Sequence, residues 1–215
     1  MNEEEQRKIF HYLKSKNIPY ARVAPGTLDD NSISVRSNDE QAAFEITELL
    51  ISLGHKDIAF IKGHPDHSST TLRFSGYLNA LKKNSIEFKP ELVDEGNFSY
   101  HSGEDSARKI LSLSPRPSAV FASNDYMAAA VLKVASQLSL KVPEEMSIAG
   151  FDNAPIARHI WPGLTTIAQP VEQMTYTALS KLIEQFTGQD DELPLHQETL
   201  EAQLIIREST DKVKN

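Results

Sequence analysis

The chain contains no cysteine, which excludes disulfides, thiolate metal sites and cysteine nucleophiles together. It also lacks any apolar run close to the roughly 20 residues that a membrane-spanning helix needs. The N-terminal segment is acidic and then mixed in charge, which is unlike a secretory signal. A cysteine-free chain without such a signal fits the cytoplasm. We therefore expect a cytoplasmic protein with no membrane partner.

Positive charge is also scarce. The chain has 22 Lys and Arg against 30 Asp and Glu, for a net charge of −8. A DNA-binding surface needs a basic patch to neutralise phosphates, and the densest basic cluster here is only Lys82-Lys83. This chain is predicted to bind DNA poorly by itself.

The sequence has few signals for catalysis or cofactor binding. No glycine-rich dinucleotide or P-loop motif and no nucleophile elbow is present. His55, His64, His67 and Asp66 could be arranged as a metal site, but they include no helical i, i+4 pair. We predict no catalytic residue, no metal and no cofactor. A small-molecule enzyme on a similar sheet is the alternative, and turnover or a bound metal would support it.

Helical and strand periods alternate along the chain. Helices are predicted at 40–53, 74–81, 102–113, 128–138 and 170–187, and strands at 58–61, 92–93, 118–122, 146–151 and 201–206. Short loops between such units indicate an α/β fold with a doubly wound parallel sheet. The beginning differs, because a helix around Ile9 runs into a strand at 18–23 with no strand before it. That strand is either an edge element or part of a truncated sheet.

Three polar side chains follow the carboxyl ends of the predicted strands, where open parallel sheets bind ligands. Arg73 could grip a carboxylate or a pair of hydroxyls, Asp152 could accept from hydroxyls, and Asn124 both donates and accepts. Each also has a structural interpretation: Asn124 or Asp125 caps a helix, Asp152 closes a turn, and Arg73 forms a surface ion pair. Their common position at one rim favours a ligand site.

Two aromatic residues likewise have both a ligand-binding and a structural interpretation. Phe98 either stacks on a sugar or base, or packs into the core. Trp161, which precedes Pro162, is expected to pack rather than to bind a ligand.

The residues around these positions form strings that resemble the LacI/GalR family of transcription regulators. Residues 53–61 resemble its "LGHxxIAxI" link, and 73–77 resemble "RxxGF". The remaining strings are 117–128 ("PTAVFAxNDxMA"), 142–153 ("VPxDISxxGFDN"), 162–170 ("PxLTTIxQP") and 204–210 ("LIxRxST"). All six occur in family order.

The resemblance implies a periplasmic-binding-protein-like I fold: doubly wound parallel sheets in two lobes, with a small effector between them. The effector class that it implies is a sugar, nucleoside or purine. Carried over by position, Arg73 and Asp152 are the main polar contacts and Asn124 is another. Phe98 occupies the place of a stacking aromatic residue, and Gln169 often faces the ligand. Ser69 would line the mouth, within residues 63–69.

The resemblance also predicts how the chain is divided. The C-terminal lobe is expected at 37–166 with 199–210, and a remnant of the N-terminal lobe at 1–36 with 167–198, followed by a tail at 211–215. A helix-turn-helix head, a hinge helix and several units of the N-terminal lobe are expected to be missing. Operator DNA would be contacted only through that head. The family's Asp-Asn after the first crossing reads Asn38-Asp39 here.

The resemblance further implies a homodimer, whose face includes the helix from Asp125 and the loop after Asp152. Effector binding would re-angle the lobes and so set whether two heads engage an operator. We expect this chain to keep half of the pocket and to bind effector weakly or not at all. A periplasmic-type sugar-binding protein for transport is the alternative from the same fold; it would carry a signal peptide.

Overall fold

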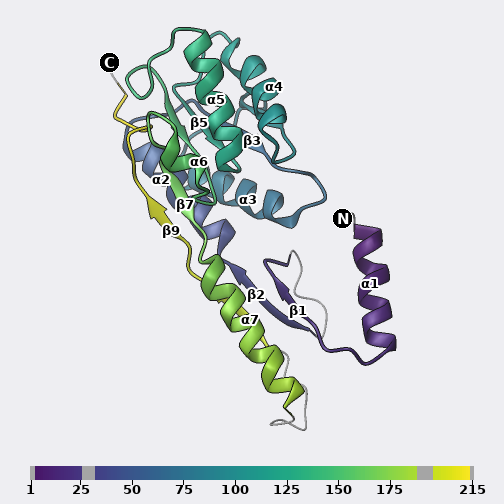
Figure 1. Ribbon diagram of the computed structural model, residues 1–215. Helices are drawn as coiled ribbons and strands as arrows, with labels where there is room; N and C mark the ends of the chain where they lie inside the picture. The colour runs from purple at the N-terminus through teal and green to yellow at the C-terminus, as the bar shows by residue number, and fades with distance from the viewer. Residues whose placement is uncertain (1–2, 26–31, 188–195, 214–215) are drawn as a thin grey trace. The chain divides into compact units, whose positions relative to one another are not determined.

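The computed structural model (Figure 1) describes residues 3–25, 32–187 and 196–213 and divides into two compact units. One unit is Met1–Asn38 with Pro170–Glu201, and the other is Asp39–Gln169 with Ala202–Asn215. Every residue that the sequence analysis proposed for ligand contact lies in the larger unit.

The larger unit is built on a parallel sheet in the order β4-β3-β5-β6. Its strands are β3 (Ile58–Lys62), β4 (Val93–Glu95), β5 (Ala119–Ala122) and β6 (Ser147–Ala149). They alternate with α2 (Asp39–Ser52), α3 (Ser68–Lys83), α4 (Tyr100–Leu111) and α5 (Asp125–Gln137). A short 3-10 turn, η1 (Pro90–Leu92), precedes β4, and α6 (Ile156–His159) follows β6.

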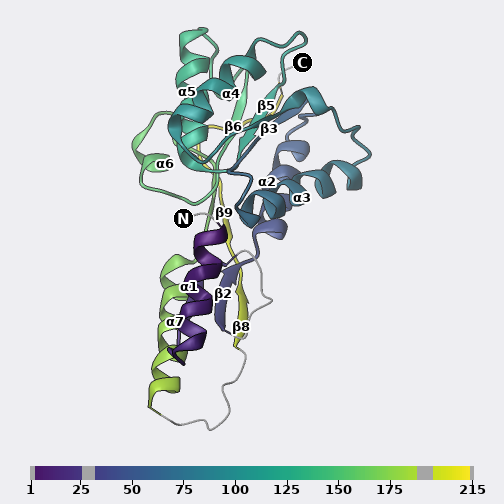
Figure 2. The same cartoon turned by 90° about the vertical axis from the view of Figure 1, so that its right-hand side faces the viewer.

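Helices cover both faces of this sheet, as Figure 2 shows: α2 and α3 lie on one side and α4 and α5 on the other. The residues of β3 divide accordingly. Ile58 and Phe60 pack with the side chains of α2 and α3, whereas Ala59 and Ile61 pack with those of α4 and α5. Because successive side chains of a strand point to opposite faces, a strand covered on both sides must be apolar throughout. The predicted α/β fold with a parallel sheet covered on both faces is confirmed.

A second, antiparallel ladder belongs to the same unit. Strand β7 (Thr166–Ala168) pairs with β9 (Gln203–Ile205), and isolated parallel bridges join Ala149 to Thr165 and Asp152 to Ala168. The sequence predicted a strand at 201–206 but none at 166–168. With only three residues, β7 offers too short a run for a period of two to be recognised.

The smaller unit holds a three-stranded parallel sheet in the order β1-β2-β8, formed by β1 (Ala21–Val23), β2 (Ile33–Ser37) and β8 (Gln197–Leu200). Helix α7 (Val171–Phe186) packs Met174 and Ala178 against Val35 and Leu200. Helix α1 (Glu3–Ser15) precedes β1, and the ring of Phe10 stacks on Tyr20 with 5.3 Å between centroids. The predicted strand at 18–23 is an edge strand of this sheet. The sequence predicted neither β2, in which Ser34 and Arg36 alternate with Ile33 and Val35, nor β8.

Candidate functional site

The candidate site lies at the carboxyl ends of β3, β5 and β6, the edge at which parallel sheets bind ligands. Gly63 follows β3 directly, Asn124 comes two residues after β5, and Asp152 comes three residues after β6. Arg73 reaches the same edge from the middle of α3. The sequence analysis grouped Arg73, Asn124 and Asp152 at one rim, and we call this edge the rim below.

Arg73 is the most enclosed member of the rim, with only 4% of its surface exposed. Its Nε donates to Asp39 Oδ2 at 2.9 Å, and its Nη1 donates to the carbonyl oxygen of Ser123 at 2.5 Å. The guanidinium carbon also lies 3.7 Å from the centroid of the Phe151 ring, a cation–π contact. Arg73 is therefore not the surface ion-pair residue that was the structural interpretation of its sequence position, because its guanidinium is buried, hydrogen-bonded twice and packed on an aromatic ring. The guanidinium is fixed in place before any ligand arrives.

Asp152 stands on the other side of Arg73, with 3.4 Å between its Oδ1 and Arg73 Nη1. Gln169 Nε2 donates to the same Oδ1 at 2.6 Å. Burial raises the pKa of the Asp152 carboxyl above its ordinary value, and the charge of Arg73 opposes that shift. One third of the side chain remains exposed, so the carboxylate is held in place but is still accessible.

The backbone at this point is unusual. Asp152 has a φ of 105° and Asn153 a φ of 54°, which are left-handed values that non-glycine residues rarely adopt. Such residues cost of the order of 1–3 kcal/mol each and persist only where their surroundings hold them in place. Strain of this kind concentrates at ligand sites, so the conformation adds to the case for a binding role at Asp152.

Asn124 and Phe98 are connected to each other. The Asn124 side chain accepts from the backbone N–H of Met127 at 2.9 Å, which confirms it as the N-cap of α5. Its amide group also donates to the carbonyl oxygen of Phe98 at 2.9 Å. Phe98 has a φ of 67°, and its half-buried ring occupies the space where a Cβ on Gly63 would lie. The ring is therefore held near Arg73, 5.8 Å from the guanidinium carbon.

Two further residues near Arg73 are Ser69, which was predicted to line the mouth of the site, and Asp39, which was not predicted as a site residue. Ser69 lies in the first turn of α3, four residues before Arg73, and is half-buried. Asp39 begins α2, and the sequence analysis had noted it only as a departure from the family pattern. The structure makes it a direct partner of Arg73. The only feature of the sequence that marks Asp39 is its place as an acidic residue in the first turn of a helix. Acidic residues are common there because they interact favourably with the helix dipole, so this place does not indicate a contact with Arg73.

Of the histidines considered for metal binding, His64 and His67 lie side by side, with 5.2 Å between their ring centroids, but His55 lies apart from them. His55 is buried at the opposite end of the strands, where its Nδ1 lies 2.9 Å from Ser118 Oγ and its Nε2 lies 2.9 Å from Ser147 Oγ. Burial lowers the pKa of His55. Within the described ranges, no group of three or more His, Asp or Glu side chains is arranged to hold a metal ion.

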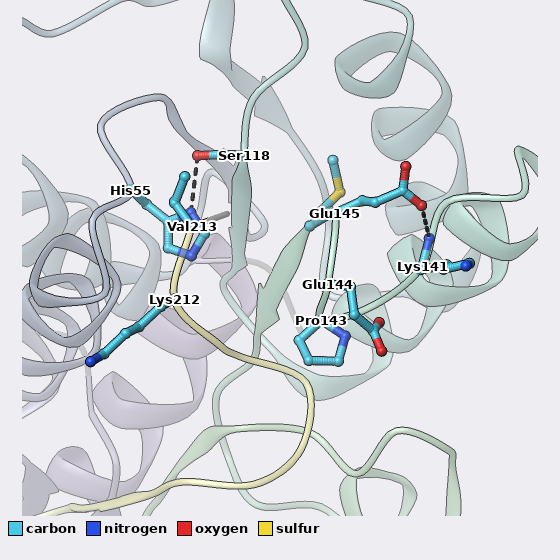
Figure 3. Close-up of a pocket in the computed structure, with 9 residues that line it drawn as sticks. His55, Ser118, Lys141, Pro143, Glu144, Glu145, Lys212 and Val213 are labelled. Atoms are coloured by element: carbon cyan, nitrogen blue, oxygen red, sulfur yellow. Dashed lines mark hydrogen bonds between the residues drawn. The ribbon is translucent and has the colours of Figure 1, made fainter. Parts of the chain in front are cut away.

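A hollow of about 710 Å³ opens beside His55 (Figure 3). Lys141, Glu144 and Glu145 lie on one side of it, and Lys212 and Val213 of the C-terminal segment on the other. Ser118 and Met146 precede β5 and β6, so this hollow is at the amino ends of the strands, away from the rim.

Trp161 corrects one prediction from the sequence. It was expected to pack, but 83% of its surface is exposed. Together with Pro162 it borders a second hollow, of about 280 Å³, whose lining combines Leu132, Leu140 and Val142 with Ser136 and Ser139. A large exposed aromatic residue is typical of a protein–protein contact.

Comparison with known proteins identifies the family of the chain. The family described as "Periplasmic binding protein-like domain" matches residues 47–210. The chain is 35% identical over 176 residues to the probable HTH-type transcriptional repressor ExuR of Bacillus subtilis, covering 81% of this chain and 53% of that protein. It is 30% identical over 210 residues to the HTH-type transcriptional repressor PurR of Vibrio vulnificus, covering 98% and 62%. The chain thus spans between 53% and 62% of the length of these two curated relatives.

Solved structures give the same result. A transcriptional regulator CelR–cellobiose complex superposes with a TM-score of 0.85 at 32% identity, covering 92% of this chain and 60% of that one. A LacI family transcriptional regulator from Enterococcus faecium with bound ribose superposes with a TM-score of 0.86 at 27% identity, covering 94% and 74%. These relatives are named as transcription regulators, which favours the regulator over the transport protein and over an enzyme. The predicted resemblance is confirmed.

Proposed function

We infer the function of the chain from its family. The chain is a periplasmic binding protein-like domain and belongs to the LacI/GalR family of transcription regulators. We propose that it is the effector-sensing domain of a transcriptional repressor. It binds a small sugar-like or nucleobase ligand at the rim and thereby controls binding to an operator. The observation that carries this proposal is the buried guanidinium of Arg73, fixed between Asp39 and Asp152.

In the proposed site, Asp152 is the principal acceptor. Its contacts with Arg73 and Gln169 both use Oδ1, so we assign Oδ2 to the hydroxyl or ring N–H donors of the effector. Arg73 supplies donors in a fixed plane, Phe98 stacks on the apolar face of the ligand, and Asn124 and Gln169 complete the polar contacts. Ser69 lines the mouth of the site. No part of this binding chemistry requires a cofactor.

Control of an operator follows from a population shift. An effector that binds one conformation better than another changes the fraction of protein able to engage DNA. We propose that operator contact is made by a helix-turn-helix head like that named in the relatives, and that the protein works in the cytoplasm. None of the helices in residues 3–25, 32–187 and 196–213 combines the length and apolar character needed to cross a bilayer.

The two units correspond, in this proposal, to the two lobes of an effector-binding core. Asp39–Gln169 with Ala202–Asn215 is assigned to the C-terminal lobe, and Met1–Asn38 with Pro170–Glu201 to part of the N-terminal lobe. The C-terminal lobe alone carries the rim residues. We therefore expect this chain to bind effector, but only weakly.

Two substitutions in the full-length protein test the function. Arg73→Ala and Asp152→Ala should each abolish the response of operator binding to effector while leaving operator binding itself intact. Electrophoretic mobility shifts on operator DNA, with and without effector, measure both quantities. Variants that respond normally would show that the rim is not the effector site. Arg108→Ala, on the exposed side of α4, is the matched control.

We also propose that two copies of the chain associate through the face at Trp161. The exposed indole is the aromatic anchor that a stable interface needs, and the adjoining hollow adds the side chains of Leu132, Leu140 and Val142. Trp161→Ser should lower the sedimentation coefficient from that of a dimer to that of a monomer, whereas Trp161→Phe should not. A wild-type chain that sediments as a monomer at high concentration would contradict this proposal.

A further inference from the structure

The carboxylate of Asp125 is fully buried in the first turn of α5, behind the rim. Its Oδ1 accepts from the hydroxyl of Thr166 at 2.6 Å, and its Oδ2 accepts from the backbone N–H of Ala154 at 2.7 Å. Both oxygens are thus engaged, one by β7 and the other by the loop that follows Asp152. The binding site described above does not use this group.

The loop that Asp125 holds is the strained one. Asp152 and Asn153 are consecutive left-handed residues, and the N–H of Ala154 is the next donor along the chain. Arg207 binds the same loop from its other side, since its Nη2 donates to Asn153 Oδ1 at 2.6 Å. A backbone in this conformation persists only while such contacts hold it, because it would otherwise relax.

Asp125 also packs closely against the backbone at the end of β6. A Cβ on Gly150 would collide with Asp125 Oδ1, so the carboxylate packs directly on the backbone at the end of β6. The backbone N–H of Asp125 also donates to the carbonyl oxygen of Phe151 at 2.9 Å. The carboxylate is consequently a rigid connection between α5, β7 and the loop after β6.

We propose that Asp125 is a positioning residue for the effector site: its carboxylate holds loop 152–154 so that Asp152 faces Arg73, and proton uptake by Asp125 loosens the loop and weakens effector binding. The effect on affinity rests on the proposed function. The effect on the loop does not, because it is a property of the ligand-free chain.

The charges around Asp125 allow this switch to operate near neutral pH. Burial raises the pKa of Asp125 to about 7, against the opposing hydrogen bonds from Thr166 and Ala154. Two charged groups face it: Asp152 on the loop raises the pKa further, and Arg207 after β9 lowers it. Beyond Asp152 lie Arg73 and Asp39. The proton is therefore exchanged within the physiological range.

The direction of the effect follows from the contacts that hold the loop. A neutral Asp125 no longer repels the charge of Asp152, which by itself would favour effector binding. Its hydrogen bonds to Thr166 and Ala154 weaken at the same time, and the bond to Ala154 is the one that joins Asp125 directly to the loop. Hydrogen bonds to a charged acceptor are about twice as strong as those to a neutral one. Affinity should therefore fall as the pH falls.

The first test uses no ligand. Amide hydrogen exchange of Ala154 and Asn153, followed by NMR in the 215-residue chain and corrected for intrinsic exchange, should show protection that is lost with a midpoint near pH 7. Asp125→Asn has the shape of the protonated residue and the same lack of charge, so Ala154 and Asn153 should be weakly protected at every pH and the transition should be absent. Thr166→Val removes a contact that lowers the pKa, so it should move the midpoint to higher pH. Asp105→Asn is the control, because the Asp105 side chain is exposed on the surface of α4, and it should leave the midpoint unchanged.

Protection that is independent of pH in the wild type, or a transition that persists in Asp125→Asn, would overturn the proposal. The second test measures affinity for cellobiose, ribose, adenosine and adenine by NMR titration at pH 8 and pH 6. For a probe that binds, affinity should fall about fivefold in the wild type and stay constant in Asp125→Asn. A wild-type affinity that is independent of pH would also overturn it. If no probe binds while the amide transition is present, the proposed function fails and the role of Asp125 in the loop stands.

Discussion

The guanidinium of Arg73 and the carboxylate of Asp39 lie 2.9 Å apart, and both side chains are almost wholly buried. A buried ion pair of this kind fixes geometry more than it adds stability, because desolvation of the two charges offsets most of their attraction. Removing one partner is costly, however, since it leaves an uncompensated charge in the interior. The pair therefore fixes the position of the Arg73 guanidinium at the rim.

Arg73→Ala should destabilise the chain by about 3–5 kcal/mol, because it leaves Asp39 buried and unpaired. The double variant Arg73→Ala/Asp39→Ala should lose less than the sum of the two single variants. Urea denaturation followed by circular dichroism measures all three. Arg108→Ala removes a half-exposed arginine from α4 and should cost less than about 1 kcal/mol. Additive losses in the double variant would show that the two residues are not coupled.

Asp152→Asn should separate binding from stability. Asparagine tolerates left-handed backbone at least as well as aspartate, so the loop should keep its conformation. The loss of a charged acceptor should lower effector affinity by about 10- to 100-fold. NMR titration gives the affinity and a thermal melt gives the stability. Equal affinity in the variant and the wild type would remove Asp152 from the site.

Gly63→Ala should act on the site through Phe98 alone. The added methyl group would occupy the space of the Phe98 ring and displace it from its place beside Arg73. Affinity should fall by about the amount that Phe98→Ala removes, and the double variant should show no further loss. Titration of the two single variants and the double variant checks this cycle. Full additivity would mean that Gly63→Ala does not act through Phe98, and unchanged affinity in Phe98→Ala would mean that Phe98 does not contact the effector.

His55 should make the chain less stable in mild acid. Its folded-state pKa is lowered by burial, so below the ordinary histidine value of about 6.5 the unfolded chain takes up a proton that the folded chain does not. Stability should fall with pH from there, by at most about 1.4 kcal/mol per unit.

The comparison for His55 is made with His55→Asn, in which this dependence should be missing. Urea midpoints at pH 7, 6 and 5 provide the measurement. Asp125 contributes with the opposite sign, because its raised pKa lets the folded chain take up the proton first as the pH falls below about 7. Chains with His55 and with Asn at position 55 should therefore also be compared when both carry Asp125→Asn. Parallel pH profiles for His55→Asn and the wild type would contradict the role assigned to His55.

Much of the larger unit could be predicted from the sequence, because strands buried on both faces appear as continuous apolar runs. Residues 58–61 and 118–122 predict β3 and β5 within one residue at each end. The smaller unit was harder, since β2 and β8 carry polar side chains. The rim followed from topology, which brings Arg73, Asn124 and Asp152 to one edge.

The sequence does not show which side chains far apart along the chain contact each other in the fold. Asp39 and Arg73 are 34 residues apart, and Asp125 and Thr166 are 41 apart. No local pattern marks either pair. The exposure of Trp161 was also missed, because tryptophan usually packs when one chain is considered alone.

The most direct test of the account is an NMR titration of isotope-labelled chain with cellobiose, ribose, adenosine and adenine, each at up to tens of millimolar to detect weak binding. We predict that at least one of these ligands shifts the amides of Gly63, Phe98, Asn124, Asp152 and Gln169 together, and that Asp152→Asn suppresses these shifts. Shifts that fall elsewhere, or an unchanged spectrum with every ligand, would contradict the assignment of the rim as the effector site.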